Sequence, residues 1–167
     1  TSTCYGISTS GNVFLLDTDY YSPVGKVKKR TPVEHCQGIR DFEDRMIAKY
    51  QKPVMNKTID SAEGAIRNQY YDMYGEHLHP VAKKKKVDMV DYGQVLVAQG
   101  RFFVLKTKGN EIFISEHQQY RWDSRSIETN PDNPSVVKVD DHTVDSFQYF
   151  VLDNLSHLGL AVGKGVR

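Results

Sequence analysis

The acidic residues at the start of the last predicted helix are the first candidates for chemistry in this chain. Asp141, His142 and Asp145 are three and four residues apart, so a helix would place them on one face. Asp141 and Asp145 repel each other there unless a positive group lies between them. The helix dipole explains an acid at position 141, but it explains Asp145, a full turn further in, less well. The spacing therefore indicates a metal-binding or catalytic site as the alternative to a helix cap.

A second carboxylate, Asp60, closes the predicted strand that ends Thr58-Ile59-Asp60. A purely structural role would explain Asp60 at this position, either in an Asx-type turn or as a helix cap. Ligands of α/β sheets gather at the carboxyl ends of parallel strands, so Asp60 and Asp145 can also converge on one site. Carboxylate oxygens suit Mg²⁺ or Mn²⁺, and two such ions can drive phosphodiester hydrolysis. Without metal, crowding of Asp60, Asp141 and Asp145 should raise at least one carboxyl pKa.

Positive charge is concentrated in two places, although the formal net charge of the chain is only +1. One is a run of four lysines: Lys83, Lys84, Lys85 and Lys86. The other is a predicted loop that contains Lys26, Lys28, Lys29 and Arg30. Such runs can simply be solvated loops. They can also contact phosphates, because each lysine that neutralises a phosphate releases a counterion. Any affinity for nucleic acid must come from this uneven placement of charge.

The elements that must position these residues alternate between strands and helices. β-Branched and aromatic residues between turn signals predict strands over residues 3–8, 12–20, 54–60, 78–81 and 102–105. Apolar residues at helical spacing predict helices over residues 32–52, 62–74, 87–99, 111–120 and 141–158, with a polar loop over 123–138. Thr31 and Glu34 form a capping box for the first helix, and Ser61 should cap the second. This order indicates an α/β fold.

The composition fits one soluble globular domain over residues 1–167, with 39% hydrophobic and 26% charged residues. Cys4 and Cys36 are far apart and show no metal-binding spacing, so two free thiols are expected. No apolar run has the length of a membrane span. No GxxxxGK[ST] motif occurs, which excludes a P-loop ATPase in these residues.

Several segments match, in order, a pattern that covers nearly the whole chain. They are Asp17-Thr-Asp-Tyr-Tyr21, Ile59-Asp60-Ser61, His79-Pro-Val-Ala-Lys83, Leu96-Val-Ala-Gln-Gly-Arg101, Tyr120-Arg-Trp-Asp123 and Asp141-His142-Thr-Val-Asp145. With them the chain resembles the C-terminal nuclease domain of large terminase subunits, the DNA-packaging proteins of tailed bacteriophages. The His-x-x-Asp opening of the last helix is the most specific of these segments.

The resemblance implies an RNase H-like fold, with a central mixed β-sheet flanked by helices. It also implies an endonuclease that uses two Mg²⁺ or Mn²⁺ ions to cut concatemeric double-stranded phage DNA during packaging. Asp60 and Asp145 take the places of two metal-binding carboxylates, and His142 takes that of a histidine which binds metal, positions water or assists the leaving group. The family's first carboxylate lies on a leading strand that would precede Thr1. We therefore expect a truncated fragment, without the ATPase domain, that cuts poorly.

The partners implied by the resemblance are double-stranded DNA and, in the full protein, the ATPase domain, the small terminase subunit and the portal. No membrane is involved, and the expected location is the host cytoplasm. Two alternatives stay open. The chain can be a non-catalytic module that grips DNA or docks within the packaging motor. It can also be another RNase H-like nuclease, such as a resolvase or a transposase.

Overall fold

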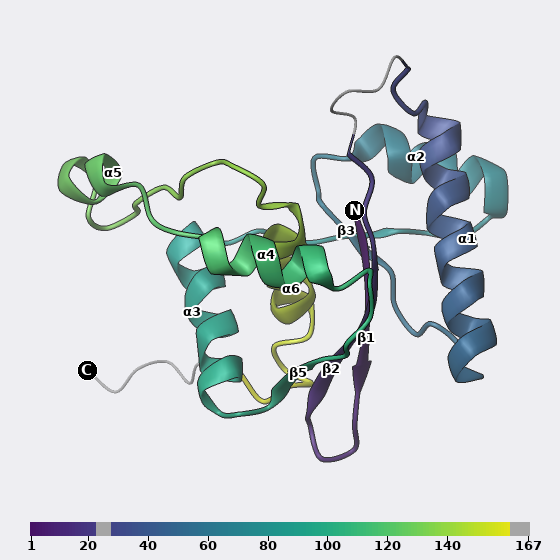
Figure 1. The fold of residues 1–167 in the computed structure, drawn as a ribbon. Helices are drawn as coiled ribbons and strands as arrows, with labels where there is room; N and C mark the ends of the chain where they lie inside the picture. Colours follow the sequence, from purple (N-terminus) through teal and green to yellow (C-terminus); the bar gives the residue numbers. More distant parts are fainter. Residues whose placement is uncertain (23–27, 161–167) are drawn as a thin grey trace.

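The strands form two small sheets in the computed structural model, which describes residues 1–22 and 28–160 (Figure 1). In the first sheet, β1 (Ser2–Ile7) pairs antiparallel with β2 (Val13–Asp19), and β2 pairs parallel with β5 (Phe102–Val104). In the second, β3 (Thr58–Ile59) pairs parallel with β4 (His79–Pro80). The expected α/β fold with a mixed sheet flanked by helices is confirmed, and a second, two-stranded parallel sheet accompanies the mixed one.

The second sheet is shorter than the sequence predicted. Residues 54–60 and 78–81 were each expected to be strands along their whole length, yet only two residues of each form a ladder. Met55 is 90% exposed, so the segment before β3 has no packing partner for its apolar residue. The Asn56 side chain instead donates a hydrogen bond to Asp153 at 2.6 Å. Pairing therefore begins only where Lys57 accepts a hydrogen bond from the His79 amide.

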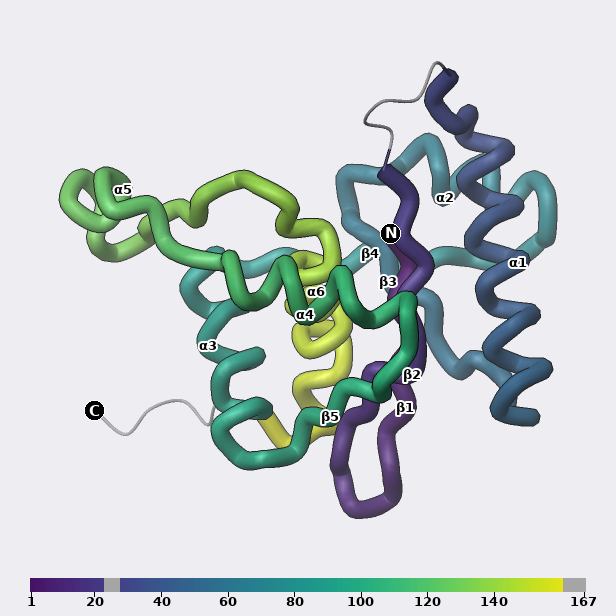
Figure 2. The backbone as a smooth tube through the Cα atoms, in the orientation of Figure 1, coloured from purple at the N-terminus to yellow at the C-terminus, as the bar shows by residue number. Residues whose placement is uncertain are grey.

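The helices lie on two sides of these strands. On one side α1 (Pro32–Tyr50) packs against α2 (Gly64–Tyr74); on the other, α3 (Lys86–Ala98) and α4 (Glu111–Gln119) pack against α6 (His142–Asp153) (Figure 1). A short helix, α5 (Ser124–Thr129), lies in an excursion away from the sheets (Figure 2). The sequence predicted only a loop there. Asp123 explains the difference, because its carboxylate accepts the amide hydrogens of Arg125 and Ser126 and so caps this helix.

Local capping signals explain the start of α1 and the end of α2. Thr31 and Glu34 form the predicted capping box at the start of α1. Gly75 ends α2 with φ +68°, a left-handed conformation that glycine adopts without steric cost. The start of α2 differs from the prediction, since Ser61 does not cap it and the helix begins at Gly64. Asp60 provides the reason: its side chain accepts the Ala62 amide hydrogen in an Asx-type turn before the helix.

Helix α6 holds the molecule together because it contacts both sheets. Its residues Phe147 and Val151 lie in the main hydrophobic core, together with residues of β2, α3 and α4. The Phe150 ring stacks on Tyr5 of β1 at 4.0 Å between centroids. At its end, Asp153 accepts a hydrogen bond from Thr58 of β3 at 2.6 Å. The carboxyl end of α6 is thereby fixed beside β3.

Smaller features agree with the sequence. Cys4 and Cys36 are free cysteines. A second core cluster joins Cys36 of α1 to Tyr70 of α2 and to Leu78. Among the described residues, no helix combines the length and apolar character needed to cross a membrane. Lys26 of the second basic cluster lies outside the described residues.

Candidate active site

Asp60 lies directly after β3, at the carboxyl end of the second sheet. Lys83, in the loop after the parallel strand β4, places its ammonium group 2.7 Å from both carboxylate oxygens of Asp60. The Ala62 amide donates to one of these oxygens at 2.8 Å. The parallel pairing of β3 and β4 explains this contact, because the chain leaves both strands at the same edge. The Asp60 side chain stays 29% exposed, so solvent still reaches it.

Asp145 lies in the first turn of α6 and is also paired with lysine. The Lys86 ammonium group donates to Asp145 Oδ1 at 2.5 Å and to Gln148 Oε1 at 2.9 Å. Lys86 is the first residue of α3, so the packing of α3 on α6 delivers it to this position. Lys138 lies 3.6 Å from the second oxygen, Asp145 Oδ2. With 23% of its side chain exposed, Asp145 is about as accessible as Asp60.

Tyr149 contacts Asp60 from the helix that contains Asp145. Its hydroxyl donates a hydrogen bond to Asp60 Oδ2 at 2.9 Å, and it lies one helical turn after Asp145 on α6. Burial raises the pKa of the Tyr149 phenol, and the negative charges of Asp145 and Asp60 raise it further. The phenol therefore stays protonated and acts as a donor. Through this hydrogen bond the fold brings the end of β3 beside Tyr149, one helical turn after Asp145 on α6.

Burial and hydrogen bonds act in opposite directions on the pKa of Asp60. Burial alone would raise the pKa of this carboxyl group. Hydrogen bonds from Lys83, the Ala62 amide and Tyr149 outweigh burial and hold the pKa below its ordinary value. The sequence led us to expect a raised pKa from crowded acids. That expectation concerned at least one of Asp60, Asp141 and Asp145; Asp60 is not a group with a raised pKa, because its hydrogen bonds stabilise the charged form.

Asp141 belongs to the start of α6 and not to the Tyr149 contact. It is buried, and its carboxylate accepts a hydrogen bond from Lys138 at 2.8 Å. It does not cap α6 through its side chain. That role falls to Glu116 of α4, whose carboxylate accepts the amide hydrogen of Thr143 at 2.6 Å and its hydroxyl hydrogen at 2.5 Å. Glu116, only 2% exposed, received no role in the sequence analysis.

His142 lies apart from the two carboxylates. Its ring centroid is 6.2 Å from that of Tyr20, and it lines a hollow of about 290 Å³ with five other residues: Thr1, Tyr21, Lys29, Arg30 and His35. Within the described residues, no hydrogen bond or ion pair links His142 to Asp60 or Asp145. The spacing predicted that Asp141, His142 and Asp145 share one helical face. In the structure no hydrogen bond or ion pair joins the described His142 ring to the Asp145 carboxylate.

The donor set fits a hard divalent cation. Mg²⁺ is commonly held by one or two carboxylates, with water and substrate phosphate completing its shell, and Asp60 and Asp145 provide two. The ammonium groups of Lys83 and Lys86 show that each carboxylate accepts a cation at its exposed oxygens. In the described part of the chain, no group of three or more His, Cys, Asp or Glu side chains is arranged to hold a metal. An all-protein metal cage is thus absent from these residues.

The comparison with protein families agrees with this arrangement. The description "terminase RNase H-like domain" matches residues 1–153. The chain belongs to this family. Membership confirms the predicted family and RNase H-like fold, and it supports a general role in nuclease action or DNA packaging. Neither the curated proteins nor the solved structures contain a match to the chain.

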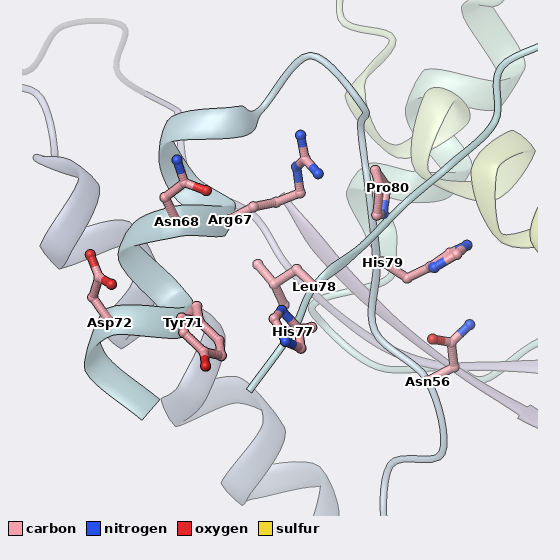
Figure 3. A pocket seen from close by; sticks show the side chains of 9 residues that line it. All are labelled: Asn56, Arg67, Asn68, Tyr71, Asp72, His77, Leu78, His79 and Pro80. Carbon is pink, nitrogen blue, oxygen red and sulfur yellow. The ribbon is translucent and has the colours of Figure 1, made fainter. Parts of the chain in front are cut away.

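The terminase domain has a larger hollow elsewhere, of about 820 Å³, between α2 and β4. Figure 3 shows the side chains that line it: Asn56, Arg67, Asn68, Tyr71, Asp72, His77, Leu78, His79 and Pro80. The Tyr71 and His77 rings are stacked at 4.5 Å between centroids. Neither Asp60 nor Asp145 lines this hollow, and Asp72 is its only carboxylate. It is therefore separate from the candidate site.

Three further residues of the terminase domain's site were missed by sequence reasoning: Tyr149, Gln148 and Glu116. Tyr149 could have been found, because it follows Asp145 by four residues and so lies on the same helical face. Gln148 is 3% exposed and holds Lys86 against α6. No local pattern marks Glu116 as the cap of a helix that begins 26 residues later, since 142 − 116 = 26.

Proposed function

We propose that this domain is a metal-dependent endonuclease that cuts double-stranded, concatemeric phage DNA during genome packaging. One observation carries the proposal: in a chain of the terminase RNase H-like family, Tyr149 of α6 donates a hydrogen bond to Asp60 after β3, one helical turn from the partly exposed Asp145. Asp60 and Asp145 would hold Mg²⁺ or Mn²⁺, and the family resemblance implies two ions. Bound ions of this kind activate water and stabilise the leaving oxygen of a phosphodiester.

The chain's own residues orient this site. Tyr149 fixes the Asp60 carboxylate through its hydroxyl, and the Ala62 amide fixes the other oxygen. Gln148 and Lys86 fix Asp145. The His142 ring lies beside Tyr20 and does not contact the carboxylates. To act in catalysis, it would have to move toward them or contact the bound DNA directly. Among the proposed DNA contacts, Lys84 and Lys85 are exposed and face the phosphate backbone most freely.

The test is plasmid cleavage in Mn²⁺ by the purified chain, for which slow cutting is expected, and by Asp60→Asn and Asp145→Asn, followed long enough to resolve a slow rate. Each substitution should lower the rate at least about a hundredfold, because removing a hard oxygen ligand weakens metal binding. Asp91→Asn is the matched control, since Asp91 is an exposed acid of the neighbouring helix α3 with no role here. Equal cleavage by wild type and Asp145→Asn would overturn the assignment.

A non-catalytic module that grips DNA within the motor is the second candidate. The pairing of both carboxylates with lysines favours it, because the paired site is nearly neutral and can approach phosphates without repulsion. In that case the chain would bind duplex DNA with strong salt dependence and would not cleave it in Mn²⁺. The family match supports a terminase over a resolvase or a transposase. The packaging ATPase, small subunit and portal remain the proposed partners of the full protein.

A further inference from the structure

The four-lysine run is divided in two by its contacts. Lys83 and Lys86, at the ends of the run, turn inward and contact Asp60 and Asp145. Lys83, Lys84 and Lys85 are all exposed, but neither Lys84 nor Lys85 contacts an acid in the described residues. Lys84 donates to the Tyr92 hydroxyl at 3.3 Å, a contact that involves no acid. The run is therefore not a uniform basic patch, although its sequence is uniform.

Lys83 and Lys86 each have more than one contact, so their positions do not depend on a single ion pair. Lys86 is 18% exposed, and two acceptors on α6, Asp145 and Gln148, fix its ammonium group. Lys83 contacts both oxygens of Asp60 and lies 5.2 Å from the centroid of the Tyr149 ring. Each ammonium group occupies carboxylate oxygens that a divalent cation would need.

We propose that Lys83 and Lys86 are positioning residues that hold Asp60 and Asp145 in place and compete with divalent cations for their oxygens. This inference rests on the proposed function, because it takes these two acids as the metal ligands. Carboxylates on neighbouring elements repel each other, and Asp60 and Asp145 each have a lysine ammonium group within 2.7 Å. The lysines remove that repulsion, but a divalent ion can bind only after the ammonium group gives up its oxygen. Metal affinity is therefore lower than the two carboxylates alone would give.

The test measures Mn²⁺ binding by calorimetry and by thermal shift, without DNA. In Lys86→Met the aliphatic chain is kept and the charge is lost. This variant should melt at a lower temperature without metal, yet it should bind Mn²⁺ roughly tenfold more tightly, since one nearby like charge is gone. Lys83→Met should act in the same direction. Lys86→Arg keeps the charge and should leave the affinity close to that of wild type.

Lys84→Met and Lys85→Met are the matched controls. They remove the same charge from the same segment, but neither residue contacts a candidate ligand. Their Mn²⁺ affinity should stay within about twofold of wild type, because exposed charges are screened by solvent. A purely structural role of Lys86 would lower the melting temperature without tightening Mn²⁺ binding. Should Lys86→Met not fold, Lys86→Gln and Lys83→Met carry the same comparison.

Unchanged or weaker Mn²⁺ binding by folded Lys83→Met and Lys86→Met would overturn the inference, and so would an equal gain in the two controls. Absence of Mn²⁺ binding in wild type and all variants would also overturn it. The proposed function is judged separately, by DNA cleavage in Asp145→Asn. If cleavage is absent but Lys86→Met still binds Mn²⁺ more tightly than wild type, the nuclease proposal fails. The inference that lysines compete with divalent cations for the carboxylates is then still supported.

Discussion

Two clusters of charged residues in this molecule have similar chemistry but different construction. One joins α1, α2 and the segment before β3 through Arg40, Glu43, Lys57 and Glu76, with Tyr70 beside them. The other is the candidate site around Asp60, Asp145 and Tyr149. Each contains carboxylates, positive side chains and a tyrosine hydroxyl. Composition alone would not separate them.

The difference lies in how the partners are shared. In the first cluster, Lys57 and Arg40 each contact both Glu43 and Glu76, so the four side chains interlock. Glu43 is only 10% exposed and also accepts a hydrogen bond from Tyr70. Lys57 contacts both carboxylate oxygens of Glu43, so an added cation would have to displace partners that Glu43 shares with Glu76. This cluster joins elements of the fold.

In the candidate site Asp60 pairs with Lys83, whereas Asp145 pairs with Lys86 and, at 3.6 Å, with Lys138, so Asp60 and Asp145 share no lysine. Lys83 lies in a loop and Lys86 is the first residue of a helix. The two lysines contact different carboxylates, so one can be displaced from its carboxylate while the other keeps its contact. Both carboxylates also keep more than a fifth of their side-chain surface exposed. The number of acids in a charged cluster therefore does not identify a metal site. A better criterion is whether a metal ion can replace one positive side chain without disturbing the others. Four predictions test this contrast.

The largest expected effect is on folding stability. Lys57→Met should lower the free energy of unfolding by about 3 kcal/mol, because it leaves the buried Glu43 carboxylate and Glu76 with one partner fewer. Lys83→Met, at the more exposed site, should cost about 1 kcal/mol or less. Urea denaturation of both variants measures the two values. Equal losses would mean that the two clusters are held alike.

Metal should act on one cluster only. Mn²⁺ at about tenfold above its dissociation constant should stabilise the wild-type chain by about 1.4 kcal/mol, through mass action. The corresponding rise in melting temperature, a few degrees, should persist in Lys57→Met and disappear in Asp145→Asn. Thermal scans with and without Mn²⁺ give the comparison. A shift that survives in Asp145→Asn would place metal binding elsewhere.

Acid should loosen the interlocked cluster gradually. Hydrogen bonds from Arg40 and Lys57 lower the pKa of Glu76 from 4.5 to about 2. A carboxyl group with a lowered folded-state pKa stabilises the fold above its unfolded pKa, and this contribution is lost as the pH falls through the folded one. The stability difference between wild type and Glu76→Gln should therefore be full at neutral pH and vanish toward pH 2. Urea denaturation over this range measures it; a difference that grows with acid would contradict the assigned pKa direction.

The smallest effect concerns DNA binding by the outward lysines. Lys84→Ala and Lys85→Ala should each reduce the slope of log affinity against log salt by about 0.9, the loss of one phosphate contact. Lys52→Ala, an exposed lysine beyond the end of α1, should leave the slope unchanged. Fluorescence anisotropy on a labelled duplex, over a range of salt concentrations, gives the slopes. If Lys84→Ala and Lys85→Ala both had the same slope as Lys52→Ala, Lys84 and Lys85 would not contact the DNA phosphates.

The sequence by itself determined the features that depend on neighbours along the chain. Thr31 and Glu34 set the start of α1, and Gly75 ends α2. The alternation of strands and helices gave the α/β class, and the motif order gave the terminase family. Asp60 at a strand end and Asp145 in the first turn of a helix were likewise readable, because turn and helix geometry fix them within a few residues.

Only the tertiary structure decided which side chains meet. Lys83 to Lys86 are identical in type, yet the crossing of β4 and α3 past β3 and α6 turns two of them toward carboxylates. His142 shares a helix turn with Asp145 but lies beside Tyr20, across a contact between distant segments. Tyr149 acquires its role from Asp60, 149 − 60 = 89 positions earlier. Such contacts depend on how elements pack in space, and local spacing carries no information about that packing.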